Sequence, residues 1–403
     1  MPSTPPPGEA APADGALPAP ALDALADRPL SLYLHVPFCA TRCGYCDFNT
    51  YTATELGSAP GSSRDAYLRA VRAELDLALD VLGRPPAVRT VFFGGGTPTL
   101  LSAAELTGLL DSVRERFELA PDAEVTTEAN PETLDREYLA ALVEAGFTRL
   151  SLGMQSSVPH VLEVLERRHT TGRVQQVVGW ARQAGFSSVS LDLIYGTPGE
   201  SPADWRASLE SALALDPDHV SAYSLIVEPG TRLAARMRRH ELPGIDDDVH
   251  AAYYLIAADV LSGAGLGAYE VSNWARPGNE CRHNLAYWRS DNWWGIGPGA
   301  HSHIGGVRWW NVRHPATYTT RLVGGHSPAE AREVLDAGQR RMERVLLELR
   351  LSEGLDVALL TGSERRRVDG VIAAGWARLV GGRLILTVAG RLLADGISRD
   401  LLD

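Results

Sequence analysis

The sequence predicts an α/β fold, a partial and open (β/α)6 barrel followed by a small C-terminal winged-helix-like α+β domain. Two observations predict it. Short apolar and β-branched runs alternate six times with amphipathic stretches between residues 32 and 262, and the alternation later gives way to helices and a single hairpin. Strands separated by helices indicate βαβ units and a parallel sheet. Six units are fewer than the eight that close a barrel, so we expect this one to stay open.

Each element follows from its own periodicity, since strands are short apolar runs and helices carry apolar residues on one face. The six strands expected in the barrel are Leu32–Val36, Val88–Phe93, Ala123–Glu128, Arg149–Met154, Ser188–Ile194 and His219–Ile226. The six helices expected there are Arg64–Leu82, Ala103–Phe117, Arg136–Ala145, Gly172–Ala184, Pro202–Leu215 and Asp246–Ser262. The C-terminal domain is expected from helices at Met342–Leu351 and Arg366–Ala374, a hairpin over Ala377–Thr387 that turns at Gly381-Gly382, and a final short helix.

Composition divides the chain into four regions. Residues 1–28 are rich in Pro, Ala and Gly, and we expect a disordered tail. Residues 29–265 hold the barrel. Residues 266–328 are rich in loops, Trp and Gly, and residues 329–403 form the winged-helix-like domain.

Composition also excludes several classes of protein. The chain has 403 residues, of which 45% are hydrophobic and 22% charged, as is ordinary for a globular protein. A net charge of −12 argues against broad binding to nucleic acid. No apolar run approaches the ~20 residues of a membrane span, and the N-terminus lacks the pattern of a signal peptide. Four cysteines in a chain of this length fit a reducing cytoplasm.

The most informative motif is C-x3-C-x2-C at Cys39, Cys43 and Cys46, directly after the first strand. Three thiolates can hold three corners of a [4Fe–4S] cube, which leaves one iron open to another ligand. A zinc site is the alternative, but it needs a fourth ligand, and only Asp47 and His35 lie nearby in the sequence. A disulfide would leave an odd cysteine.

Polar residues and glycines follow the other strands, at the edge where parallel α/β folds collect their chemistry. Gly94-Gly95-Gly96-Thr97-Pro98 follows the second strand, Glu128 and Gln155 end the third and fourth, and Asp192 lies in the fifth. Each alone could be structural, but their gathering at one edge indicates a site. The amino and carboxylate groups of S-adenosylmethionine (SAM) can chelate an open iron. One electron from the cluster can then cleave the C–S bond of SAM to give a 5′-deoxyadenosyl radical.

Together these motifs resemble the radical SAM superfamily, and within it the oxygen-independent coproporphyrinogen III oxidase group. The resemblance covers nearly everything from Leu32 to the C-terminus. It rests on the runs His35–Cys39, Cys43–Phe48, Gly94–Pro98, Glu128–Pro131, Gly153–Ser156 and Glu228–Thr231. It implies the partial barrel of that superfamily, with a [4Fe–4S] cluster and SAM as cofactors.

Two features resemble the HemW-type haem chaperone branch of this group. Phe48 stands where the oxidases carry a further cysteine, and His283–Trp288 spells H-N-x-x-Y-W. This branch implies a protein that binds haem and transfers it to haem-dependent proteins, including respiratory enzymes of the membrane, with residues 266–328 as the haem or substrate segment. The alternative is a radical SAM oxidase or decarboxylase acting on coproporphyrinogen III or a related tetrapyrrole, so enzymatic activity stays open, as does a homodimer. Any membrane contact of such a cytoplasmic protein would be peripheral, at the inner face.

The resemblance also implies site residues. The cluster ligands are Cys39, Cys43 and Cys46. His283 is expected to bind haem, with a structural or substrate-pocket histidine as the alternative, and His301 and His303 are weaker candidates. Cys281 is expected to be a small buried hydrophobe rather than a haem thiolate. The expected contacts to SAM are Tyr33, Tyr45, Gly95, Gly96, Thr97, Glu128, Gln155, Arg167, Asp192 and Ile226.

Overall fold

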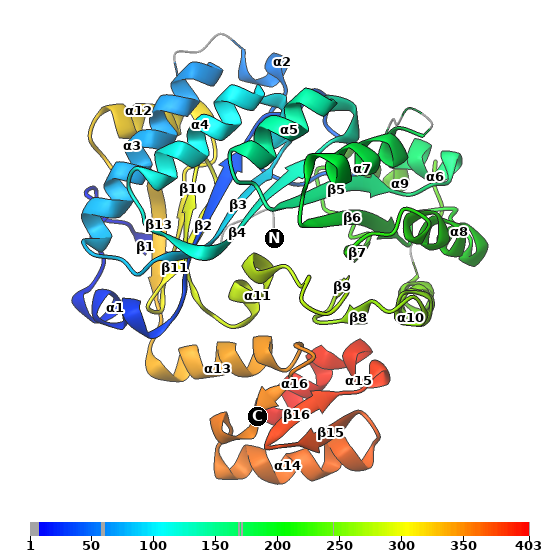
Figure 1. The fold of residues 1–403 in the computed structure, drawn as a ribbon. Helices are drawn as coiled ribbons and strands as arrows, with labels where there is room; N and C mark the ends of the chain where they lie inside the picture. The colour runs from blue at the N-terminus through cyan, green and yellow to red at the C-terminus, as the bar shows by residue number, and fades with distance from the viewer. Residues whose placement is uncertain (1–7, 58–60, 168–169, 171, 245, 403) are drawn as a thin grey trace.

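The centre of the fold is one curved sheet (Figure 1). The computed structural model describes residues 8–57, 61–167, 170, 172–244 and 246–402. Within them, thirteen strands pair in the order β1-β13-β12-β11-β10-β2-β3-β4-β5-β6-β7-β9-β8. The strands from β10 to β7 in this order run parallel, and the two outer strands, β1 and β8, do not pair with each other, so the barrel is partial and open as predicted.

The strands agree with the predicted ones to within a few residues wherever both exist. Those of the parallel part are β2 Leu30–Val36, β3 Val88–Gly95, β4 Leu119–Ala129, β5 Arg149–Gln155, β6 Ser188–Tyr195, β7 His219–Ser224 and β10 Asn292–Ile296. The remaining strands of the sheet are β1 Glu9–Ala10, β8 Gly267–Ala268, β9 Asn273–Ala275, β11 His301–Ile304, β12 Val307–Asn311 and β13 Ala329–Val334.

Helices cover the outer face of the parallel strands (Figure 1). Several of them have first turns capped by side chains; in α4, for example, Ser102 and Glu105 form a reciprocal capping box. The helices of this part are α2 Ala53–Leu56, α3 Arg64–Leu82, α4 Ala103–Arg114, α5 Arg136–Glu144, α6 Pro159–Val164, α7 Arg173–Ala184, α8 Pro202–Leu213, α9 Arg232–Arg238, α10 Asp247–Gly263, α11 Arg282–Trp288 and α12 Pro315–Val323.

Period-two alternation gives the parallel strands one dry face and one polar face. Leu34, Val91 and Leu191 are fully buried in the core, and burying such a side chain contributes about 1.5–3 kcal/mol. Residues two apart on the same strand share a face. The alternate positions therefore face inward and include polar residues such as Ser151 and Asp192, whose side chains hydrogen-bond to each other. This inner face carries the candidate site.

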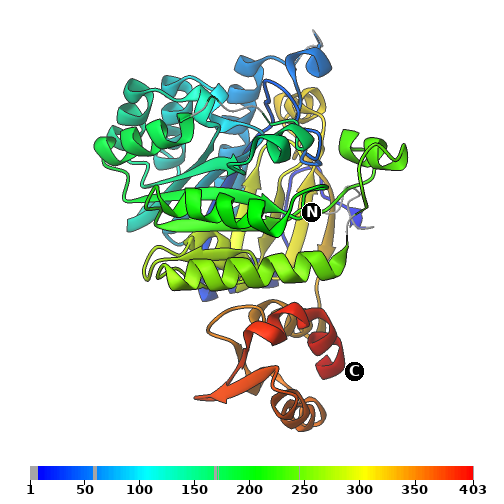
Figure 2. The ribbon, with the colours of Figure 1, turned by 90° about the vertical axis from the view of Figure 1, so that its right-hand side faces the viewer.

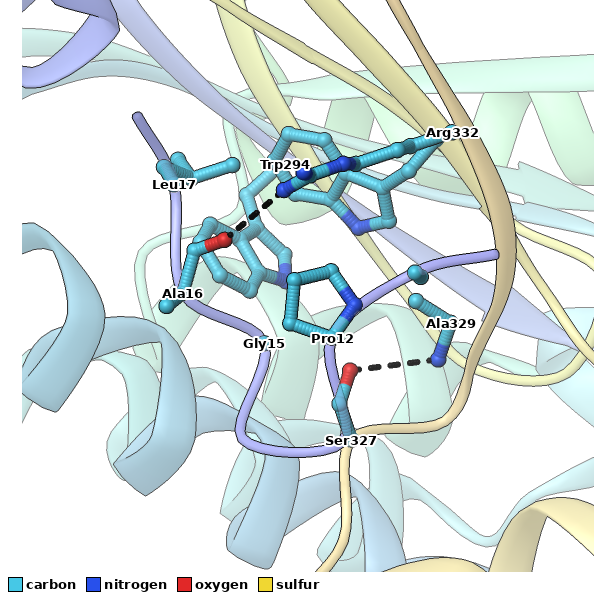
Figure 3. Close-up of a pocket in the computed structure, with 10 residues that line it drawn as sticks. Pro12, Gly15, Ala16, Leu17, Trp294, Ser327, Ala329 and Arg332 are labelled. Atoms are coloured by element: carbon cyan, nitrogen blue, oxygen red, sulfur yellow. Dashed lines mark hydrogen bonds between the residues drawn. The ribbon is translucent and has the colours of Figure 1, made fainter. Parts of the chain in front are cut away.

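The N-terminal region is not the disordered tail that we predicted, as far as it is described. Residues 8–28 form β1, α1 (Ala19–Asp23) and a 3-10 turn, and β1 pairs with β13. Figure 3 shows this segment over Trp294, with Arg332 donating a hydrogen bond to the carbonyl of Ala16 at 3.2 Å. Trp309 lines the same pocket. The prediction was wrong because Pro and Ala composition resembles disorder, while the apolar side chains of Ala21 and Leu25 join the main core.

The segment after residue 266 is also more regular than the loop-rich stretch that we predicted. It adds β8 to β12 and the short helix α11 to the fold. Within it, β10 pairs in parallel with β2, the strand that precedes the cysteine motif. Short strands with intervening glycines give a weak periodic signal, so the pairing that defines them is visible only in three dimensions.

The short helices α6 and α9 are among those that were not predicted. α6 and α9 pack against each other through Val161, Leu165 and Leu233, beside the cysteine loop. Helices of six or seven residues are marginal on their own and need such packing, so their sequences carry little periodicity.

The C-terminal domain has its own core and lies below the barrel in both views (Figures 1 and 2). Its helices are α13 Ala337–Glu348, α14 Gly362–Ala373, α15 Val388–Leu392 and α16 Ala394–Leu402, and its strands are β14 Leu355–Asp356, β15 Ala377–Val380 and β16 Arg383–Leu386. The hairpin β15–β16 turns at Gly381-Gly382, as predicted. An ion pair between Arg289 and Glu353 at 3.1 Å, and Arg391 donating to the carbonyl of Glu270 at 2.9 Å, join the domain to the barrel.

Candidate functional site

The cysteine loop closes back on the end of β2. The amide of Cys39 donates to the carbonyl of Tyr51 at 3.0 Å, and the amide of Tyr51 donates to Pro37 at 2.7 Å. Two further bonds hold the far side of the loop, from Gly44 N to Leu165 O at 3.3 Å and from Leu233 N to Gly44 O at 2.8 Å. The helices α6 and α9 thus clamp the loop that carries the three thiols.

The three thiols lie close enough to influence one another. Burial is the main cause that raises the pKa of Cys39, and it also raises the pKa of Cys46 to about 11. The neighbouring thiols of the motif raise the pKa of both residues further. Like charges in a buried loop disfavour three thiolates at once. A positively charged iron centre reverses that balance, because coordination deprotonates thiols.

The glycine loop after β3 lies directly against the cysteine loop. Gly96 N donates to Val36 O, and Thr97 N donates to Phe38 O, each at 2.8 Å. A Cβ added at Gly96 would lie 2.5 Å from that carbonyl oxygen of Phe38, so only glycine allows this approach. The hydroxyl of Thr97 lies 3.9 Å from Sγ of Cys39. The two motifs, which are 51 residues apart between Cys46 and Thr97, therefore form one surface.

Two carboxylates stand on the inner face next to this surface. Glu128 accepts a hydrogen bond from Gly95 N at 3.0 Å, and burial, followed by repulsion from Asp192, raises its pKa to about 8. Asp192 accepts from Ser151 at 2.9 Å and from Ser221 at 2.7 Å, and burial raises its pKa as well. Sequence reasoning found both carboxylates but missed the two serines, although period-two alternation places them on the same inner face.

Gln155 and Arg167 meet above Gly153. Gln155 adopts φ 64°, an uncommon left-handed conformation for a non-glycine residue, at an irregularity between β5 and β6. Arg167 Nη2 donates to Gly153 O at 3.3 Å, and Arg167 Nη1 lies 3.6 Å from Sγ of Cys43. Among the described residues, Nε of Arg167 is buried and has no hydrogen-bond partner. Such an orphaned donor is a ready contact for an anionic group of a ligand.

Two tyrosines, Tyr33 and Tyr45, lie beside these residues. The hydroxyl of Tyr33 lies 3.0 Å from Nδ1 of His35, and burial followed by the charge of Glu128 raises its pKa. Tyr45 packs on the apolar cluster between α6 and α9, and burial raises its pKa, with Cys43 as the second cause.

Ile226 and Phe48 stand apart from these residues. Ile226 lies beyond the end of β7 and is 68% exposed, so among the expected SAM contacts it is the one that the fold leaves most open. Phe48, two residues after the last cysteine of the motif, is 56% exposed. We call the other residues that are expected to contact SAM the cradle.

His283 is buried against strand β3 rather than presented to a ligand. Only 2% of it is exposed, Nδ1 lies 2.7 Å from the hydroxyl of Thr90, and Nε2 lies 2.8 Å from that of Tyr287. Burial lowers its pKa to about 3, which keeps the ring neutral. With both ring nitrogens engaged, this geometry favours the structural role over the iron ligand that we expected first.

The other residues of this region have internal partners too. Glu124 accepts from the amides of Arg282 and His283 at 2.9 and 3.0 Å, which caps α11 with a carboxylate. Cys281 is buried, as expected, and burial raises the pKa of its thiol to about 12. Nδ1 of His303 lies 2.9 Å from the carbonyl of Asp291, and His301 stacks on Trp310.

Comparison with known proteins connects this geometry to a family. The model of the radical SAM superfamily matches residues 33–212. The heme chaperone HemW of Mycobacterium tuberculosis (strain ATCC 25618 / H37Rv) is 54% identical over 383 residues, which cover 95% of this chain and 97% of the relative. This chain belongs to the HemW family of the radical SAM superfamily.

A second member of the HemW family and one solved structure are less similar in sequence. The heme chaperone HemW of Bacillus subtilis (strain 168) is 36% identical, covering 85% of this chain and 88% of the relative. The solved structure of the coproporphyrinogen III oxidase HemN from Escherichia coli superimposes with a TM-score of 0.80 at 24% identity, and covers 96% of this chain and 94% of that one. The two families share the fold.

Membership of the superfamily implies a [4Fe–4S] cluster and SAM. It also agrees with the cysteine motif at the end of β2. None of the helices in the described part of this HemW family member is both long and apolar enough to cross a bilayer.

Proposed function

We propose that this protein binds haem and passes it to haem-dependent proteins, and that it holds a [4Fe–4S] cluster on Cys39, Cys43 and Cys46. The observation that carries the proposal is the 54% identity to a heme chaperone over 95% of the chain. Phe48 supports it, because this position is a cysteine in the oxidases that the sequence resembles.

The donor set beside the thiols fits SAM. Its ammonium group suits the carboxylate of Glu128, its ribose hydroxyls suit Asp192, and its carboxylate suits the guanidinium of Arg167 with its unpartnered Nε. The glycine loop places backbone amides and carbonyls beside the cysteine loop, since a Cβ at Gly95 or Gly96 would collide with His35 or Phe38. The other residues assigned to this cradle are Tyr33, Tyr45, Gly95, Gly96, Thr97 and Gln155.

The chain's own groups orient the cofactor and tune the charge around it. The cluster supplies one electron for cleavage of a C–S bond when SAM is bound. Ser151 and Ser221 fix the rotamer of Asp192, and the amide of Gly95 fixes that of Glu128. Tyr45 packs on the apolar cluster between α6 and α9 and lies beside Cys43, at the thiol side of the site.

The recipients are proposed to be haem-dependent proteins, including respiratory enzymes, so contact with a membrane would be peripheral and through the recipient. A homodimer is proposed as the assembly to test first. No nucleic acid is proposed as a partner, because the net charge is −12.

The test is an anaerobic titration of the reconstituted protein with haem and, separately, with coproporphyrinogen III. We expect saturable haem binding in the absorption spectrum, transfer of that haem to apomyoglobin as a probe acceptor, and no decarboxylated product. Oxidative decarboxylation of coproporphyrinogen III without haem transfer would replace the proposal with the oxidase alternative, whose fold the chain shares.

A further inference from the structure

The chain that leaves the cysteine loop is held by a glycine-rich turn from the far part of the sequence. We call residues 47–52 the exit arm and residues 295–300, from the last two residues of β10 to the start of β11, the glycine turn. The turn reads Gly295-Ile296-Gly297-Pro298-Gly299-Ala300, a motif to which the proposed function gives no role.

Asn49 makes the contact from the exit arm. Its Nδ2 donates to Pro298 O at 2.9 Å and to Arg313 O at 2.8 Å, and its Oδ1 accepts from the hydroxyl of Tyr51 at 3.2 Å. The backbone carbonyl of Asn49 also lies 2.9 Å from Nε2 of His35. Both amide donors and the side-chain oxygen are therefore used, three residues after Cys46.

The glycines of the turn make room for this contact. A Cβ at Gly299 would lie 2.5 Å from Nδ2 of Asn49, and a Cβ at Gly297 would lie 2.6 Å from the carbonyl oxygen of His35. Both glycines also have a positive φ, of 73° and 111°. Backbone conformation and close approach together require glycine at both positions.

The glycine turn is itself held by the buried carboxylate of Glu74. Glu74 on α3 accepts from Gly297 N at 2.7 Å, from the amide of Asn311 at 2.7 Å and from the hydroxyl of Tyr318 at 2.5 Å. Asn311 donates to Gly297 O at 2.9 Å as well. The glycine turn is thus a rigid support and not a free loop.

We propose that Asn49 is a positioning residue for the cluster, and that the glycine turn is the support against which it holds the exit arm. The proposal rests on the cluster proposed above at Cys39, Cys43 and Cys46. The new claim is that the placement of Cys46 depends on β10 and the glycine turn. Both lie outside the six βα units that carry the cradle. Without the contact between Asn49 and the glycine turn, the exit arm opens more often, and the cluster is released more readily.

The experiment compares Asn49→Ala and Gly299→Ala with a matched control, Gly325→Ala. Gly325 has the same φ of 73° as Gly299, but a Cβ there meets nothing within 4 Å. Backbone strain is therefore common to both glycine variants, and only Gly299→Ala pushes on Asn49. Asn49→Asp keeps the shape of the side chain and replaces both donors with acceptors, which separates hydrogen bonding from packing.

The readouts are the iron and sulfide content after anaerobic reconstitution, the rate of iron release to a chelator, and the electron paramagnetic resonance (EPR) spectrum of the reduced cluster. We expect Asn49→Ala, Asn49→Asp and Gly299→Ala to release iron about tenfold faster, the ratio that the loss of one net hydrogen bond gives, with shifted EPR g-values. Gly325→Ala should match the wild type.

The positioning role of Asn49 would be overturned if all three variants kept an intact fold by circular dichroism and had the release rates and spectra of the wild type. A wild-type protein that takes up no cluster would instead overturn the proposed function.

Discussion

Arg167 bridges the cysteine loop and the end of β5. Its Nη1 lies 3.6 Å from Sγ of Cys43, while its Nη2 donates to Gly153 O at 3.3 Å. One guanidinium thus stands beside a proposed cluster ligand and still has a buried, unpartnered Nε among the described residues.

Replacing Arg167 should therefore weaken SAM binding more than it affects the cluster. A hydrogen bond to a charged group contributes about 1.5–3 kcal/mol, so Arg167→Gln should lower the affinity for SAM by about tenfold to a hundredfold. The measurement is a SAM titration followed by the EPR spectrum of the reduced cluster. Arg378→Gln, on an exposed strand of the C-terminal domain, serves as the control. Unchanged affinity in Arg167→Gln would remove Arg167 from the cradle.

Three of the four cysteines should be required for the cluster, and the fourth should not. Cys39→Ala, Cys43→Ala and Cys46→Ala should each abolish stable binding of iron and sulfide, because a cube held by two thiolates lacks a protein ligand at a second iron. Cys281→Ala should retain a full cluster, since this thiol is buried beside Glu124 at 3.6 Å. Iron and sulfide analysis after reconstitution measures both. Loss of the cluster in Cys281→Ala, with the fold intact, would contradict the assignment.

His283→Ala should lower stability and leave haem binding in place. The change removes a buried ring and leaves the hydroxyls of Thr90 and Tyr287 without their partner, a loss of about 3 kcal/mol. Urea unfolding gives the stability, and a haem titration of the folded variant gives the affinity. His326→Ala, at an exposed position, is the control and should change neither. A normally stable variant that no longer binds haem would restore His283 as the ligand.

Stability should fall as the pH rises through the range in which Glu74 ionises. Burial raises the pKa of Glu74 to about 7, above the ordinary value of about 4.5, against the opposing effect of its hydrogen bonds, of which that from Tyr318 is the largest. Between these values the folded protein holds a proton that the unfolded chain has released, so the free energy of unfolding decreases with increasing pH, by on the order of 3 kcal/mol in total.

Glu74→Gln tests this assignment, because a glutamine does not titrate. Its unfolding free energy should vary less between about pH 5 and about pH 8 than that of the wild type, whatever its absolute value. Parallel curves for the two proteins would assign the pH dependence to another group, such as Glu200, whose pKa burial also raises to about 7.

The parallel barrel and the cradle could be predicted because local signals specify them. Helix α3 begins and ends at the predicted residues, Arg64 and Leu82, since Ser63 caps its start and Gly83 follows its end. Cys39, Gly95 and Glu128 were visible as chemistry-bearing residues at strand ends, and Asp192 as one inside a strand. Parallel strands bring their ends to one edge.

The features that could not be predicted depend on contacts between residues that are distant in the sequence. The strand β1 exists only because β13 pairs with it, and α6 and α9 are too short to show a period. The burial of His283 follows from Thr90, which lies 193 residues away in the sequence. No local pattern reports whether a histidine in a loop-rich segment points at a ligand or at a strand.

The pairing of β10 with β2 has a consequence for the order of events during synthesis. Leu30 at the start of β2 pairs with Asn292, so the first strand of the barrel gains its second neighbour only after nearly three quarters of the chain has been made. Such non-local contacts form late and slow folding. The glycine turn follows β10 directly, so a nascent chain on the ribosome would expose its three thiols without the support for their exit arm. Cluster insertion is accordingly expected only after β10 and the glycine turn have emerged from the ribosome.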